Sequence, residues 1–158
     1  MLVKNIMVTK LTTAYVDEHV CDALDRMRQE NLRMLPIVTE DNVVAGVFST
    51  FSVMAHVVPD YITSGDLQQV TYAPDMGILR RHYNKMAHKS IGAVMDKNPL
   101  LVHGKDSLLS VAAALTAYGK HEYAIVVDEQ QHLSGVISAG DILDRLRCIL
   151  KEGDVNDA

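Results

Sequence analysis

The chain has 158 residues, a formal net charge of −5 and a hydrophobic fraction of 48%, a composition typical of globular proteins. The acidic balance, the absence of Trp and the presence of only two Phe argue against a nucleic-acid surface built on aromatic stacking. No apolar run reaches the ~18 residues of a membrane-spanning helix, and the first residues lack the hydrophobic length of a secretory signal. Two cysteines far apart, Cys21 and Cys148, indicate a reducing cytosol rather than a disulfide framework. We therefore expect a cytoplasmic protein.

The first part of the chain predicts the order strand, helix, strand, strand, helix. Short apolar runs predict strands over residues 12–16, 34–39 and 43–48. Apolar residues at helical spacing predict helices over residues 20–31 and 52–58.

A stretch over residues 59–90 follows, with breaks at Pro59, Gly65 and Pro74. Its second half, over residues 75–89, has helical spacing and is basic. A solvated linker helix and a face that meets phosphate or a partner are both compatible with this pattern.

The second half of the chain repeats the order of the first. Strands are predicted over 100–103, 123–127 and 133–137, and helices over 107–118 and 142–150. Val3 falls on Ile91, an offset of 88, and one extra residue, Gln131, then shifts the register so that Gly46 falls on Gly135. Each copy is too small to bury much surface alone. We therefore expect an α/β (α+β) fold in which two β-α-β-β-α repeats pack as a pseudo-two-fold pair. The predicted parts are repeat 1 over 1–58, a partly helical linker over 59–90, repeat 2 over 91–150, and a polar, frayed tail over 151–158.

The stretch GVISAGD, residues 135–141, marks the junction between the last strand and the closing helix. The Ser138 hydroxyl can cap that helix by satisfying amide groups that would otherwise be unpaired. The same helix start also suits an anion such as phosphate. The Asp141 carboxylate, an acceptor-only group, can take hydrogen bonds from paired sugar hydroxyls. From the residues alone, a helix cap and a ligand site are both open.

The duplicated unit, with Gly-h-h-Ser-x-x-Asp at its last junction, resembles the cystathionine-β-synthase (CBS) domain pair. The resemblance depends on residues 35–38 followed by 46–49, and on residues 123–128 followed by 135–141. It implies a disc-like pair with clefts that bind AMP, ADP, ATP or S-adenosylmethionine. It also implies a homodimer that regulates an unknown effector protein rather than catalysing a reaction.

The resemblance also implies the residues of the binding site. Asp141 would hold the ribose hydroxyls, and Ser138 would support the ribose or the phosphate. The other candidates are Val136, Ile6, Met7, Thr12, Leu32 and Met34, with Arg33 as the nearest basic residue for a phosphate. Core packing accounts equally well for Leu32 and Met34, and a plain strand position accounts for Thr12.

The first copy departs from the motif, because Ser52 stands where the second copy has Asp141. A charge-assisted hydrogen bond contributes roughly 1.5–3 kcal/mol, so its loss weakens a ligand site. We predict one competent cleft at Asp141 and one weak or empty cleft near Ser49, Ser52, Met95 and Lys120.

The sequence offers little support for a catalytic function. Seven histidines are present, but none lies in a recognisable nucleophile or metal motif, and no glycine-rich phosphate loop occurs. We therefore expect no catalytic residues, no metal and no required cofactor. Three functions stay open: a regulatory sensor of an adenosine-containing ligand, a constitutive dimerisation or interaction module without nucleotide, and a nucleic-acid binder that uses the basic residues 80–89.

Overall fold

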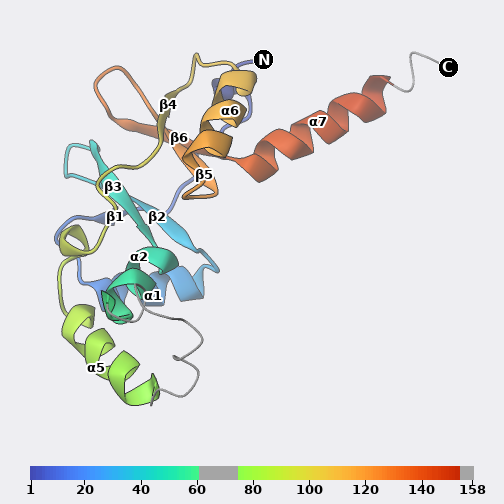
Figure 1. Ribbon diagram of the computed structural model, residues 1–158. Helices are drawn as coiled ribbons and strands as arrows, with labels where there is room; N and C mark the ends of the chain where they lie inside the picture. Colours follow the sequence, from blue (N-terminus) through green and yellow to red (C-terminus); the bar gives the residue numbers. More distant parts are fainter. Residues whose placement is uncertain (61–74, 154–158) are drawn as a thin grey trace. The chain divides into compact units, whose positions relative to one another are not determined.

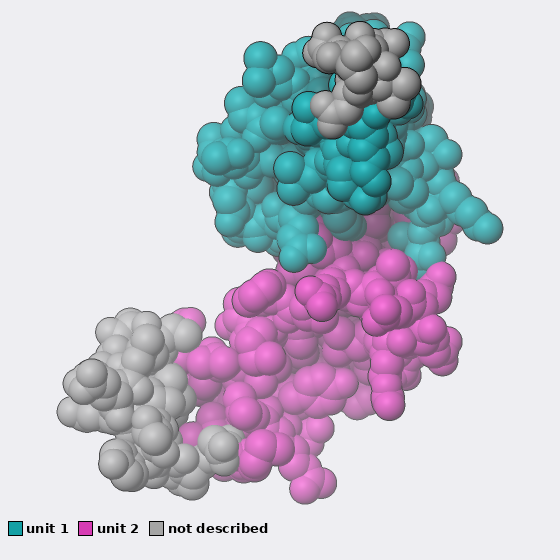
Figure 2. Space-filling model, turned by 90° about the vertical axis from the view of Figure 1, so that its right-hand side faces the viewer, with its two compact units in different colours: residues 1–12, 41–44, 99–158 teal, residues 13–40, 45–98 magenta. Residues whose placement is uncertain are grey.

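The computed structural model describes residues 1–60 and 75–153 of the chain. Two compact units make up the chain, and each is described by itself (Figure 2). Unit 1 contains residues 1–12, 41–44 and 99–158, and unit 2 contains residues 13–40 and 45–98. Two of the breaks expected in the linker, Gly65 and Pro74, lie outside the described residues.

Unit 2 is built on a three-stranded sheet with the order β1-β2-β3. The strands are β1 (Ala14–Tyr15), β2 (Met34–Val38) and β3 (Val44–Ser49), and the helices are α1 (Val20–Gln29), α2 (Thr50–Val57) and α5 (Asp75–Ala87). β1 and β2 are parallel, with Ala14 opposite Ile37. A parallel pair needs a crossover connection, which α1 supplies (Figure 1).

The core of unit 2 follows the apolar spacing of α1. Val20, Ala23 and Met27 lie on one helical face and are buried. They pack with the buried strand residues Leu35, Ile37 and Phe48 in one cluster. Met86 of α5 joins the same cluster, so α5 packs on the unit and is not merely a solvated linker.

Unit 1 repeats the arrangement with the order β4-β5-β6. Its strands are β4 (Leu101–His103), β5 (Tyr123–Val127) and β6 (Leu133–Ser138), and its helices are α6 (Leu108–Tyr118) and α7 (Ala139–Gly153). β4 is parallel to β5, and β5 is antiparallel to β6 with Tyr123 opposite Ser138. Gly119 ends α6 with a φ of 58°, a left-handed conformation that favours glycine. Figure 1 shows α7 extending beyond the sheet that precedes it.

Each unit takes its opening segment from the other repeat. In unit 1, the segment after the 3-10 helix η1 (Val3–Asn5) reaches β6, where Val8 and Val136 exchange backbone hydrogen bonds of 2.8 and 3.0 Å. In unit 2, the segment after η2 (Ile91–Ala93) places Asp96 against Val47 with bonds of 2.8 and 2.9 Å. The predicted repeats therefore differ from the compact units, because each unit combines the opening segment of one repeat with the sheet of the other.

The predicted element order is confirmed, and several boundaries differ. The closing helix α7 begins at Ala139 rather than 142 and continues to Gly153, through the first residues of the predicted tail. Side-chain capping at Ser138 starts the helix directly after the strand. The first strand is shorter than predicted and covers only Ala14–Tyr15.

Candidate functional site

The junction between β6 and α7 is held by reciprocal hydrogen bonds between Ser138 and Asp141. The Asp141 amide donates to Ser138 Oγ at 3.1 Å, which caps the helix. In return, Asp141 Oδ2 accepts from the Ser138 amide at 2.8 Å and from its hydroxyl at 2.7 Å. The sequence predicted a cap here, and the structure confirms one that fixes both side chains.

The Asp141 carboxylate keeps one oxygen for another partner. The three hydrogen bonds that join it to Ser138 involve only Oδ2 and the backbone amide, and Oδ1 accepts no hydrogen bond from any described residue. The side chain is half-buried. A carboxylate oxygen that is held in place and partly shielded can accept hydrogen bonds from sugar hydroxyls.

Three of the predicted apolar residues lie in the same unit as this junction. Val136 precedes it on β6 and pairs with Val8, the residue that follows Met7. Ile6 and Met7 pack partly buried against the core of unit 1. The structure therefore brings Ile6, Met7 and Val136 into the unit that holds Ser138 and Asp141. Thr12 belongs to this unit and is half-buried.

The other three predicted residues, Leu32, Arg33 and Met34, belong to unit 2. Leu32 is half-buried against the core of that unit, and the exposed Arg33 accepts a backbone hydrogen bond from the Thr50 amide at 3.1 Å. Met34 is half-buried and opens β2. Their participation in a site with Asp141 stays a prediction.

The equivalent junction in unit 2 has the same shape without the charge. Ser49 caps α2 by accepting from the Ser52 amide at 3.1 Å, and the Ser49 amide donates to Ser52 Oγ at 3.3 Å. The two hydroxyls lie 3.2 Å apart, and Ser49 is only 2% exposed. A neutral pair of this kind satisfies the helix start but offers no carboxylate to a ligand. Of the other residues named for the weaker cleft, Met95 lies in unit 2 and Lys120 in unit 1.

Sequence reasoning missed two residues near the Asp141 junction. Tyr123 lies opposite Ser138 in the strand register, and burial raises the pKa of its phenol, which therefore stays neutral. Arg145 lies four residues after Asp141 on α7. The i, i+4 spacing was the available signal, because it places both side chains on one helical face.

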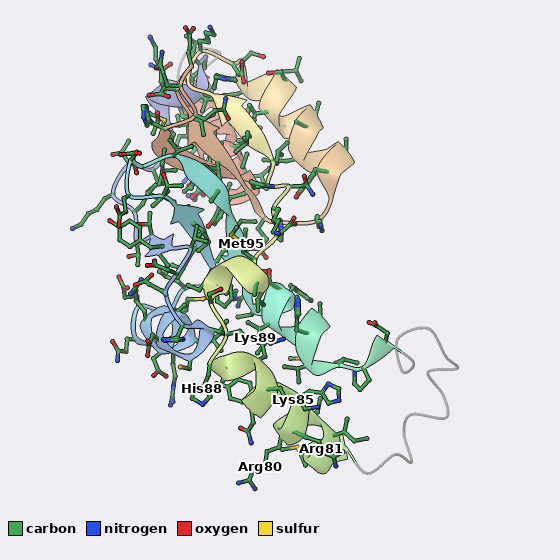
Figure 3. All side chains as sticks on the ribbon, turned by 90° about the vertical axis from the view of Figure 1, so that its left-hand side faces the viewer. Arg80, Arg81, Lys85, His88, Lys89 and Met95 are labelled. Carbon is green, nitrogen blue, oxygen red and sulfur yellow. The ribbon has the colours of Figure 1, made fainter. Side chains whose placement is uncertain are left out.

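The basic stretch proposed for a phosphate or a partner is exposed. Figure 3 shows its labelled side chains along α5 and the turn that follows it. They are Arg80, Arg81, Lys85, His88 and Lys89, all exposed to solvent. The helix is anchored on its other side by Met86 and Ala87, which are buried.

Among the described residues, no group of His, Cys, Asp and Glu side chains is arranged to hold a metal ion. Within the same residues, no helix combines the length and apolarity needed to cross a membrane.

Comparisons with known proteins identify the family. The family model for the CBS domain matches residues 3–58 and again residues 91–148, which together make up most of the chain. A curated relative, the CBS domain-containing protein CBSX1, chloroplastic, of Arabidopsis thaliana, is 26% identical over 160 residues. The match covers 97% of this chain and 64% of the relative, so the chain spans less than two thirds of that protein.

Solved structures of CBS-pair proteins share the fold. CBSX2 from Arabidopsis thaliana has a TM-score of 0.72 and 24% identity, with 95% of this chain and 96% of that one covered. A structure of CBSX2 in complex with AMP has a TM-score of 0.71 and 22% identity, with 94% and 97% covered. The CBS domain pair of protein MJ0100, solved with 5′-methylthioadenosine and S-adenosylmethionine, has a TM-score of 0.65 and 21% identity, with 92% and 94% covered.

Proposed function

The chain belongs to the CBS domain family as a tandem CBS-pair protein, and on that premise we propose that it is a regulatory module for an adenosine-containing ligand. AMP, ADP, ATP and S-adenosylmethionine are the candidate ligands. The observation that supports the proposal is the Asp141 carboxylate. Its Oδ2 is fixed by Ser138, and its Oδ1 is left for the paired hydroxyls of a ribose.

Structures with the same fold support this choice of ligand. CBSX2 has been solved with AMP, and the MJ0100 pair with 5′-methylthioadenosine and S-adenosylmethionine. These ligands share an adenosine and differ in the group at its 5′ carbon. An adenosine is therefore the common element that a site at Asp141 and Ser138 would recognise. Val136, Ile6, Met7 and Thr12 belong to the same unit and would line it. The proposal for Leu32, Arg33 and Met34 rests on the family resemblance alone.

In this proposal the protein signals rather than catalyses. A ligand shifts a protein between two states only by as much as it binds one of them better. We propose that the output passes through the contacts of a homodimer, or through an effector protein, in the cytoplasm.

Titration calorimetry with AMP, ADP, ATP and S-adenosylmethionine tests the proposal. We expect one ligand per chain, with the affinity reduced about 10–100-fold in Asp141→Ala, the loss expected for one charge-assisted pair of hydrogen bonds. Ser52→Ala is the matched control, since it removes the equivalent capping side chain from the first repeat. Equal affinities of the wild type and Asp141→Ala would show that the ligand binds at another site. No binding by the folded wild type would refute the sensor.

A second function has support from one observation. Helix α7 exposes four large apolar side chains, Leu143, Leu146, Ile149 and Leu150, with exposed fractions of 42–69%. Beside them an apolar groove of about 370 Å³ runs between α6 and α7, lined among others by Leu115 and Ile142. Such a face suits a constitutive dimerisation or interaction module that binds no nucleotide. This alternative predicts a stable dimer that is unaffected by every nucleotide in the panel.

A further inference from the structure

An open cavity of about 600 Å³ in unit 1 includes two polar residues, Asn5 and Arg145, that the proposed site does not use. It is lined by Met1, Asn5, Ile6 and Arg145. The first three come from the N-terminal segment and the fourth from α7. Two of the four lining side chains are polar, and they face a space large enough to hold a phosphate-sized group.

Arg145 carries a donor that the protein does not use. Its Nε is buried and has no hydrogen-bond partner, although buried polar groups in proteins are nearly always paired. No ion pair is recorded for Arg145 among the described residues, whereas Arg147, two positions later, lies 3.4 Å from the Asp144 carboxylate. A guanidinium presents five donors in a planar fork that matches phosphate or carboxylate oxygens. A guanidinium that lines a cavity and has this unpaired donor is suited to bind an anion.

Asn5 supplies a second donor to the lining of the cavity. Its side-chain oxygen accepts from the Leu2 amide at 3.2 Å within η1. That bond orients the side-chain amide and leaves its two N–H donors for another acceptor. The cavity therefore combines a cation with a neutral donor.

The position of Arg145 connects this cavity to the Asp141 junction. Residues four apart on a helix lie on one face with Cβ atoms about 5–6 Å apart. A ribose spans a similar distance between its ring hydroxyls and the group on its 5′ carbon. Ile6, one of the residues predicted for the ligand, lines the same cavity.

We infer that Arg145 and Asn5 form an anion subsite for the 5′-phosphate of a nucleotide whose ribose is bound by Asp141. The inference rests on the proposed function and narrows it, because it selects nucleoside 5′-phosphates over adenosine derivatives without a phosphate. It also assigns to Arg145 the role that sequence analysis gave to Arg33.

A comparison of AMP with 5′-methylthioadenosine tests the inference, since both contain adenosine and only AMP carries a phosphate. In titration calorimetry, Arg145→Gln should lower the affinity for AMP about 10–100-fold, the range for a lost charge-assisted contact. The affinity for 5′-methylthioadenosine should stay within about twofold of the wild-type value. Arg147→Gln is the matched control on the same helix and should change neither affinity. An equal loss for both ligands in Arg145→Gln would show a structural role and overturn the inference. Loss of AMP binding in Arg33→Gln, with Arg145→Gln unchanged, would overturn it as well.

A second measurement separates the subsite from the proposed function. The Nε–H resonance of Arg145, assigned by its loss in Arg145→Gln, is followed by NMR while pyrophosphate is added to the wild type. A saturable shift of that resonance, with no binding of either nucleoside ligand, would refute the adenosine sensor and keep the anion subsite. No shift with pyrophosphate and no binding of AMP would overturn both.

Discussion

Gly135 of β6 lies directly against the carbonyl oxygen of Val8, so that a Cβ at this glycine would be 2.7 Å from that oxygen. The same Cβ would be 3.2 Å from the Met7 sulfur. In unit 2, a Cβ at Gly46 would be 2.5 Å from the Asp96 carbonyl oxygen. Gly46 aligns with Gly135 in the repeat, as Asp96 aligns with Val8. The glycine of each repeat therefore admits the opening segment of the other repeat.

Gly135→Ala should destabilise the protein by about 1–3 kcal/mol, because the added methyl group must displace backbone atoms. The difference in unfolding free energy is measured by urea denaturation. Gly77→Ala is the control, since Gly77 lies on α5 with no atom within 4 Å of its added Cβ. That control should leave stability unchanged or raise it by up to about 1 kcal/mol through helix propensity. Equal stabilities for the wild type and Gly135→Ala would contradict the close approach.

Ser52→Asp should create a second ligand site, because it restores the aspartate at a junction that already has the same capping geometry. In calorimetry with the ligand that binds the wild type, the stoichiometry should rise from about one to about two per chain. Ser52→Asn adds the same side-chain size without the charge and should leave the stoichiometry at one. A folded Ser52→Asp protein that still binds one ligand would show that the first repeat lacks more than the carboxylate.

The ion pair between Glu18 and Arg26 should make the stability of unit 2 depend on pH. Arg26 donates to both carboxylate oxygens of Glu18, at 2.6 and 3.3 Å, and to the Thr13 carbonyl at 2.9 Å. The hydrogen bond from Arg26 lowers the pKa of Glu18 below its usual 4.5, against the opposing effect of burial. A carboxyl group whose pKa is lower in the folded state than in the unfolded state stabilises the fold at pH values above its unfolded-state pKa. That stabilisation is lost as the pH falls through the folded-state pKa.

Glu18→Gln removes this dependence. Both side chains are about one third exposed or less, at 33% and 27%, so the expected loss at neutral pH is under about 1 kcal/mol. Urea denaturation at pH 7 and at about pH 3.5 should show a smaller acid-induced loss for Glu18→Gln than for the wild type. Glu40→Gln, an exposed position in a turn, should retain the wild-type difference. If the stability of Glu18→Gln and of the wild type depends on pH in the same way, this ion pair does not contribute to the acid-induced loss of stability.

The apolar face of α7 should form the contact of the proposed homodimer. Leu143→Glu combined with Leu146→Glu places two charges on side chains that are 65% and 49% exposed, and like charges across an interface oppose association. We expect a dimer for the wild type and a folded monomer for the double variant by sedimentation equilibrium. Cys148→Glu adds a charge at an exposed position on the other side of the helix and should stay dimeric. If the wild type and the double variant both sediment as dimers, the dimer contact lies elsewhere. If both sediment as monomers, the proposed homodimer is refuted.

The order of the elements and the duplication could be predicted from local sequence patterns alone. The helical spacing of Val20, Ala23 and Met27 predicted a face that is buried in α1, because amphipathic periodicity is a local property of the chain. The Ser138–Asp141 cap was also readable, since its partners are three residues apart.

Which segments pack together became known from the folded structure and not from the sequence. The bridge between Val8 and Val136 joins residues at opposite ends of the chain, and no local pattern specifies such a pairing. The unpaired Nε donor of Arg145 could not be predicted from the sequence either. Sequence spacing places Arg145 on the face of Asp141, but the cavity that it lines exists only once the N-terminal segment packs beside α7. Burial and hydrogen bonding between distant segments, rather than periodicity, are the physical reasons for both.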